Sequence, residues 1–190
     1  MNRFFAFTGA TVLMTASISA AYAAPNSGDQ LSVRKAKHVQ ATLALMDQQI
    51  ADISDTALLM NRTMYQGADD FDFQADQLAD LRSQVNGIGH ELAVIEAERS
   101  SLPQWQTATV DQVLPIMHEI ATESTQAINT YNANKIRLFA SDYGVETNEV
   151  SSNAEKAAHL LHGDIKLAND KAVEGRLTAA FDEQTTAGTK

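Results

Sequence analysis

The sequence predicts an all-α protein, an antiparallel up-down-up-down bundle of four long helices. The first observation is a run of apolar residues that alternates steps of three and four between Ala36 and Met64. This heptad spacing places one apolar seam along one side of a helix, so a partner helix must cover it. The second observation is that similar runs recur along the chain, and the third is that no strand-like alternation interrupts them.

The first 23 residues have the pattern of a secretory signal peptide. Arg3 precedes an apolar run that ends in the small-x-small sequence Ala21-Tyr22-Ala23. We predict cleavage after Ala23 and an exported protein, periplasmic or extracellular, with no membrane span after cleavage. The alternative is an uncleaved membrane anchor, which the interspersed threonine, serine and glycine residues disfavour. Residues 24–30 are predicted to be a flexible lead-in.

The first two helices are expected to form an antiparallel hairpin. The first helix is predicted over 30–66, and the following Gly67-Ala68-Asp69-Asp70 combines a helix-ending glycine with acidic residues suited to a helix start. The second helix repeats the heptad spacing from Leu78 to Ile95. Pro103 ends this hairpin, because proline disfavours helical geometry in the residue before it.

The third and fourth helices are predicted from near 107–109 to about 138 and from near 147–152 to about 181. Each start has the spacing of a capping box, Thr109 with Gln112 and Ser152 with Glu155. Polar residues enter the third seam, and the fourth seam is rich in alanine. Because alanine buries little area, the fourth helix is expected to be the least firmly held.

Similar helix lengths and short connections favour one closed bundle over 31–181, followed by a disordered tail over 182–190. The alternative architecture is an extended pair of helical hairpins that closes only by dimerising. The single tryptophan, Trp105, is expected in the connection between the hairpins, as a plug over one end of the core.

The composition excludes several functional classes. The net charge is −10, or −11 without residues 1–23, and no cluster of basic residues offsets it, so nucleic acid is not an expected partner. The chain has no cysteine, which excludes disulfides, thiolate metal sites and c-type haem attachment. No nucleophile–base motif or phosphate-binding loop occurs. We therefore expect neither enzyme activity nor a cofactor.

Histidines and glutamates at mid-depth of the bundle are the candidate metal ligands. Counting from the turns places four histidines from three helices in a layer about 10 Å deep, and metal sites in bundles use such convergence. Helical phase opposes this interpretation, because His90 is about 200° round the helix from the core residue Ile88. The candidates are His90, Glu91, His118, Glu119, Glu155, His159 and His162.

Four residues that weaken helices lie at the same depth: Gly87, Gly89, Pro115 and Gly163. They are open to two interpretations. Together they could bend the helices and open a small pocket, or each could occur independently.

The sequence favours an exported, non-catalytic bundle that acts through contacts with another protein or with itself, as an adaptor, envelope-stress or chaperone-like factor. The alternative is a periplasmic metal- or small-ligand-binding bundle that uses the mid-bundle His/Glu layer. The first hypothesis predicts one contiguous exposed apolar patch. Its expected members are Leu58, Leu59, Val94 and Leu160.

Overall fold

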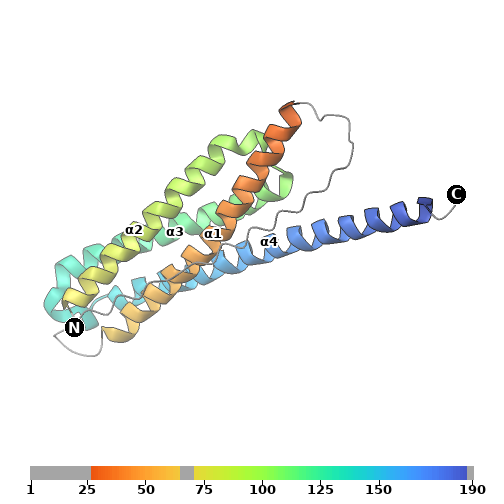
Figure 1. Cartoon of the computed structure of the whole chain (residues 1–190). Coiled ribbons are helices and arrows are strands. Elements are labelled where there is room, and N and C mark those ends of the chain that lie inside the picture. The colour runs from red at the N-terminus through yellow and green to blue at the C-terminus, as the bar shows by residue number, and fades with distance from the viewer. Residues whose placement is uncertain (1–26, 65–70, 188–190) are drawn as a thin grey trace, which may run out of the picture.

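The computed structural model describes residues 27–64 and 71–187, with side chains over 30–64, 71–135 and 137–180. The predicted signal peptide, residues 24–26 of the lead-in and the predicted turn at 67–70 lie outside these ranges. The remaining residues of the lead-in, 27–30, were expected to be flexible but form the first turn of α1. No strand occurs within them. The elements are the helices α1 (Ser27–Thr63), α2 (Phe71–Glu98), α3 (Gln104–Asn134) and α4 (Tyr143–Ala187), with the 3₁₀ turns η2 (Arg99–Ser101) and η3 (Lys135–Ala140), as Figure 1 shows.

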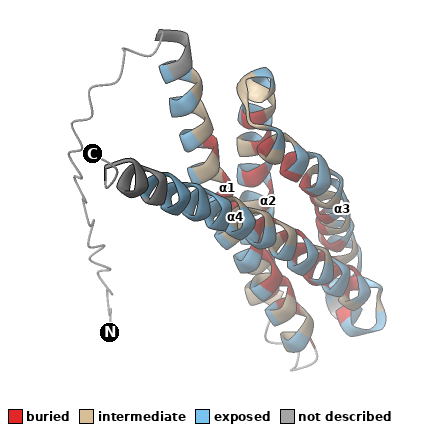
Figure 2. Cartoon of the chain, turned by 90° about the vertical axis from the view of Figure 1, so that its right-hand side faces the viewer, coloured by how far each residue is buried: buried red, intermediate tan, exposed pale blue. Residues whose placement is uncertain are grey.

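The helices close into the predicted up-down-up-down bundle (Figures 1 and 2). Each helix packs against the next one in the chain, and α4 returns to pack against α1. This neighbour pattern is that of a square bundle with α1 opposite α3 and α2 opposite α4. A closed bundle, and not an open pair of hairpins, is therefore the arrangement of this chain.

The predicted seams of α1 and α2 form much of the core. Within the α1 run only Ala36 is not buried, and every seam residue of α2 from Leu78 to Ile95 is buried. The third seam is also confirmed as far as Tyr131, whereas Asn134, the last residue of α3, is exposed. Ser124 satisfies its buried hydroxyl within its own helix, by donating to Ile120 O at 2.6 Å. Heptad spacing therefore predicted the core of these helices almost residue by residue.

The expectation that α4 is the least firmly held helix is wrong for its first half. Ala154, Ala157 and Leu161 are fully buried, and α4 packs more closely against α1 and α3 than α2 does. Small side chains allow the helix backbones to approach, so each buried atom gains more neighbours. Ser54 Oγ of α1 lies 2.9 Å from Ser151 Oγ of α4. The alanine seam therefore marks the closest packing in the bundle.

Gly144 marks a point of close approach between α1 and α4. Its carbonyl accepts a 2.6 Å hydrogen bond from Asn61 Nδ2, and a Cβ atom at this position would collide with the Met64 side chain. Glycine is therefore the residue that fits here, because any side chain would displace Met64.

The predicted starts of α3 and α4 are wrong. α3 begins directly after Pro103, whose φ of −57° suits the start of a helix. Thr109 lies inside the helix and donates a 2.7 Å hydrogen bond to Asp164 Oδ2 of α4. Its hydroxyl therefore joins two helices and does not cap the start of α3. α4 begins at Tyr143, several residues before Ser152. It also continues to Ala187, so residues 182–187, expected to be part of a disordered tail, are helical.

A buried hydrogen-bond network joins the helices near the α1–α2 and α3–α4 turns. Gln74 of α2 is 1% exposed, and its Oε1 accepts a 2.7 Å hydrogen bond from the Tyr143 hydroxyl of α4. Its Nε2 donates to Met60 O at 3.2 Å and to Thr63 Oγ1 at 2.9 Å, both in α1. One amide therefore links three helices.

Tyr131 brings α3 into the same cluster. Its hydroxyl donates to Phe71 O at the start of α2, at 2.8 Å, and its ring centroid lies 6.4 Å from that of Tyr143. The tilted geometry of the two rings is one that aromatic pairs favour. All four helices thus meet around these polar and aromatic side chains.

Removal of the Tyr143 hydroxyl should destabilise the bundle. We expect Tyr143→Phe to lower the free energy of unfolding by about 1–3 kcal/mol, because it leaves Gln74 Oε1 buried without a donor. Tyr131→Phe is the matched control and should cost less, since a main-chain carbonyl within a helix keeps another partner. Urea unfolding followed by circular dichroism measures both. Equal costs, or a larger cost for Tyr131→Phe, would contradict the role given to Gln74.

The same hydroxyl should make stability fall at alkaline pH. Burial, with smaller contributions from Tyr131 and Glu146, raises the pKa of Tyr143 above its ordinary value of 10.0. Above that pH the unfolded chain releases this proton while the folded chain retains it, so the contribution of Tyr143 is complete below about pH 10 and declines above it. The difference in unfolding free energy between wild type and Tyr143→Phe should therefore shrink as pH rises past 10. A constant difference would contradict this prediction.

Candidate functional site

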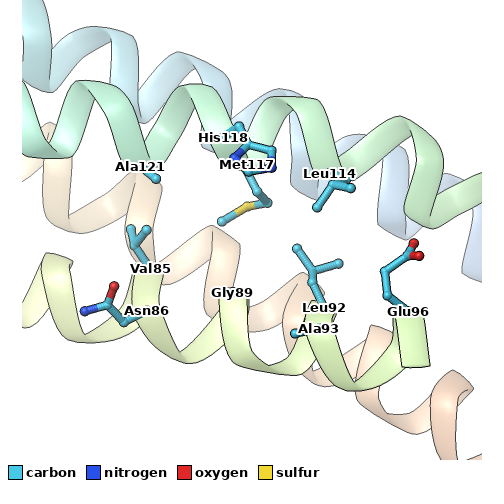
Figure 3. Close-up of a pocket in the computed structure, with 10 residues that line it drawn as sticks. All are labelled: Val85, Asn86, Gly89, Leu92, Ala93, Glu96, Leu114, Met117, His118 and Ala121. Carbon is cyan, nitrogen blue, oxygen red and sulfur yellow. The ribbon is translucent and has the colours of Figure 1, made fainter. Parts of the chain in front are cut away.

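An open groove of about 430 Å³ lies between α2 and α3, and Figure 3 shows the side chains of both helices that face it. Gly89 leaves space in its wall, since a Cβ atom there would meet nothing within 4 Å. α2 and α3 each run as one helix through Gly89 and Pro115, so the groove forms without a break in either helix. Its lining is Val85, Asn86, Gly89, Leu92, Ala93, Glu96, Leu114, Met117, His118 and Ala121.

A second hollow of about 370 Å³ continues this groove towards η3. It shares Val85, Asn86 and Ala121 with the first hollow and adds Arg82, Ser124, Thr125 and Ile128. We call the two together the α2–α3 groove. It extends for about 20 Å, from Glu96 to Arg82 at ~1.5 Å per residue.

Apart from the buried Ser124, whose hydroxyl donates to Ile120 O, the polar side chains of the α2–α3 groove are exposed or half-buried at its rim. Asn86 and His118 are exposed, while Glu96 accepts a 2.6 Å hydrogen bond from Arg99 Nη1. Arg99 also contacts both carboxylate oxygens of Asp111, at 2.5 and 2.7 Å, which ties η2 to α3. An apolar floor with a few polar groups at the rim suits an apolar or amphipathic ligand.

The predicted layer of metal ligands is spread around the outside of the bundle. All four of its histidines are exposed, as are Glu119 and Glu155, and Glu91 is half-buried. Within the part of the chain that is described, no three His, Asp or Glu side chains are grouped so that they could hold a metal ion. His162 Nδ1 lies 3.4 Å from Asp47 Oδ2, and only His118 lines the groove. Helical phase explains this result, because these residues follow seam positions or oppose them.

Four glutamates gather on α3 and α4: Glu119, Glu123, Glu146 and Glu149. Partial burial, and then the nearby carboxylate of Glu149, raise the pKa of Glu123, with smaller contributions from Glu146 and Glu119. Thr130 donates to Glu146 Oε1 at 2.8 Å. The body of the bundle thus carries mutually repelling negative charges.

The contiguous apolar patch expected from the sequence is absent at the predicted positions. Leu58 and Leu160 are half-buried, and Leu160 packs against the core. Leu59 and Val94 are exposed, 43% and 45%, but they lie near opposite ends of the bundle on α1 and α2. This prediction is wrong, because residues beside a seam are partly covered by the neighbouring helix.

Three of the ten large apolar side chains that are exposed in the described part of the chain lie on the second half of α4. This part of α4 extends beyond the other helices (Figures 1 and 2). α4 has 45 residues and α3 has 31, an excess of about 20 Å at ~1.5 Å per residue. Every side chain from Asn169 to Ala180 is exposed. We call residues 169–187 the projecting half of α4. Leu167 at its base, Val173 and Leu177 are 53%, 46% and 56% exposed.

A hollow of about 300 Å³ lies at the base of the projecting half. Trp105 lines it together with Ala108 and Gln112 of α3 and Asp164, Leu167, Ala168 and Lys171 of α4. Trp105, expected in a connection, belongs to the first turn of α3 and is half-buried against the core. We call this feature the Trp105 hollow.

Sequence reasoning missed both the projecting half and the Trp105 hollow. The signal that could have found them is helix length, because the fourth apolar run continues well past the depth at which α1 and α3 can cover it. Ile165 and Ala168 are still half-buried, whereas Ala172 and Ala179 on the same seam are exposed.

The chain matches no protein-family model, no curated protein and no solved structure. In the described ranges, no helix is both long enough and apolar enough to cross a membrane.

The α2–α3 groove should bind a small apolar probe, which Gly89→Leu should displace. We expect saturable fluorescence enhancement of N-phenyl-1-naphthylamine with the wild type and about tenfold weaker binding to the variant, because the new side chain occupies the groove. Gly87→Leu is the matched control: its position on α2 also has open space but does not line the groove. Equal effects of the two substitutions would contradict binding in the groove.

Proposed function

We propose that this chain is an exported, non-catalytic helical-bundle protein that acts through contacts with other protein chains, and that the projecting half of α4 is its contact surface. The observation that carries this proposal is the exposure of Leu167, Val173 and Leu177 on a helix that runs past the end of its own bundle. Exposed groups of apolar side chains mark contact sites on soluble proteins. A short unsupported helix is also marginal in water, so a partner would stabilise this one.

The charge distribution supports the base and first half of this surface, residues 163–180, whereas residues 181–187 add two acidic residues, Asp182 and Glu183. Residues 163–180 contain three acidic side chains and three basic ones, so this segment is neutral in a chain of net charge −10. The negative charge therefore belongs to the rest of the molecule, including the four glutamates of α3 and α4. An approaching protein meets the least electrostatic repulsion at the base and first half of the projecting segment.

The α2–α3 groove favours a second candidate function, the binding of a small apolar or amphipathic ligand. Its volume and apolar floor are in the range typical of ligand sites, and His118 with Asn86 would orient a polar end of the ligand. This candidate function corresponds to the small-ligand-binding alternative that the sequence offered, with the ligand bound on the outer face of α2 and α3. Of the histidines in the predicted mid-bundle layer, only His118 would contact the ligand.

Site-specific cross-linking in exporting cells tests the contact surface. A photoreactive benzoylphenylalanine at Leu177 should form covalent adducts with protein, because this side chain would lie within a contact. Val94 and Leu45 are matched control positions, since they are 45% and 50% exposed on the body of the bundle. We expect adducts at Leu177 and few or none at the control positions, measured by immunoblotting.

A shortened chain ending at Ala168 provides the control for folding. Its urea midpoint should match that of the full chain, since the described side chains beyond that residue are exposed. Adducts of equal yield at all three positions would refute the proposed contact surface.

A further inference from the structure

We propose that the partner of the projecting half of α4 is a second copy of this chain, bound antiparallel with α4 against α4. The inference rests on the proposed function, because it names the partner of the same surface. It predicts a two-fold symmetric contact, in which each residue contact occurs twice. The two-fold axis would pass between Ala172 and Val173.

The charges along one side of the helix carry this inference. Leu167, Lys171, Glu174 and Leu177 follow one another at steps of four, three and three, so they lie within one broad side of α4. With the axis between Ala172 and Val173, Lys171 lies opposite the partner's Glu174. A parallel pair in register would instead place each lysine against the same lysine of the partner. The charge order therefore selects the antiparallel arrangement.

The Lys171–Glu174 contact occurs twice by symmetry, so two opposite-charge pairs would join the helices. A single surface ion pair contributes little to the free energy of binding. The difference in free energy between a pair of opposite charges and a pair of like charges is nevertheless enough to select the orientation and register of two helices.

The Trp105 hollow supplies the apolar part of the contact. In this register the partner's Leu177 lies beside Leu167 and Ala168, at the place where the hollow opens. The hollow of about 300 Å³ has room for a leucine side chain, and Leu177 is 56% exposed in the single chain. Each copy would thus insert one leucine into the other copy, which is the form that strong contact points take in interfaces.

Long-range repulsion also favours this arrangement. An antiparallel pair places the two acidic bodies at opposite ends of the paired segment. A parallel pair would set the bodies side by side.

Charge reversal in the full exported chain tests the proposal. Sedimentation velocity over a wide concentration range should show a reversible monomer–dimer equilibrium. Lys171→Glu should weaken dimerisation by about tenfold, because the new carboxylate faces the partner's Glu174 at two symmetric places. Glu174→Lys should act similarly, and the double variant K171E/E174K should restore dimerisation to near the wild-type level.

Lys166→Glu is the matched control, since it changes the net charge equally but lies opposite Ala179 of the partner. It should weaken dimerisation much less than Lys171→Glu. Trp105, the only tryptophan, provides a second readout: its emission should shift to shorter wavelength with protein concentration as the partner's Leu177 excludes water. Circular dichroism of each variant shows whether the helix itself is retained.

A chain that stays monomeric at all concentrations, or a double variant that fails to recover, would overturn the second-copy proposal. Cross-linking separates this failure from that of the proposed function. Adducts at Leu177 with the mass of two chains would support pairing of two copies. Adducts of other masses, formed by a chain that stays monomeric, would refute self-pairing but support the proposed contact surface. Absence of any preference for Leu177 over Val94 refutes both.

Discussion

The rest of the bundle depends on the buried amide of Gln74. This side chain accepts a hydrogen bond from Tyr143 of α4 and donates to Met60 and Thr63 of α1, while it belongs to α2. Apolar heptad seams tolerate displacement along the helix axis, because one leucine or isoleucine can replace another in the same hole. A buried amide cannot be displaced without leaving polar atoms unsatisfied. Gln74 therefore fixes the height of α2, α1 and α4 relative to one another.

The position of this network decides which end of α4 projects. Tyr143 is the first residue of α4, so the network holds the helix at its amino-terminal end, and the Asn61–Gly144 and Ser54–Ser151 hydrogen bonds hold the next turns against α1. The excess length of α4 must then appear at the opposite end of the bundle. The exposed leucines and valine lie there as a consequence, beside the Trp105 hollow at the start of α3.

The features that the sequence predicts correctly are those that depend only on the local spacing of apolar residues. The cores of α1 and α2 follow from heptad spacing, because the side of a helix on which a residue lies depends only on its position in the chain. The starts of α3 and α4 depend on tertiary contacts. Thr109 has the spacing of a cap, yet its hydroxyl binds Asp164, a residue 55 positions away. The exposed patch was misplaced for a similar reason, since exposure depends on where neighbouring helices end. The absence of a His/Glu cluster in the described chain agrees with the phase argument for His90.

The alanine seam of α4 and the α2–α3 groove have a common physical origin. The distance between packed helices ranges from about 8 to 10 Å with the size of the side chains at the contact. Ser54, Ser151, Ala154 and Ala157 allow α4 to lie close to its neighbours, whereas the leucine and isoleucine seam of α2 holds that helix further away. The wider spacing leaves a gap along the outside of α2 and α3, and at Gly89 no side chain fills it. The groove is therefore a consequence of unequal packing across the bundle. Substitution of the small residues of α4 by larger ones would change the width of the groove, although these residues lie on the other side of the core.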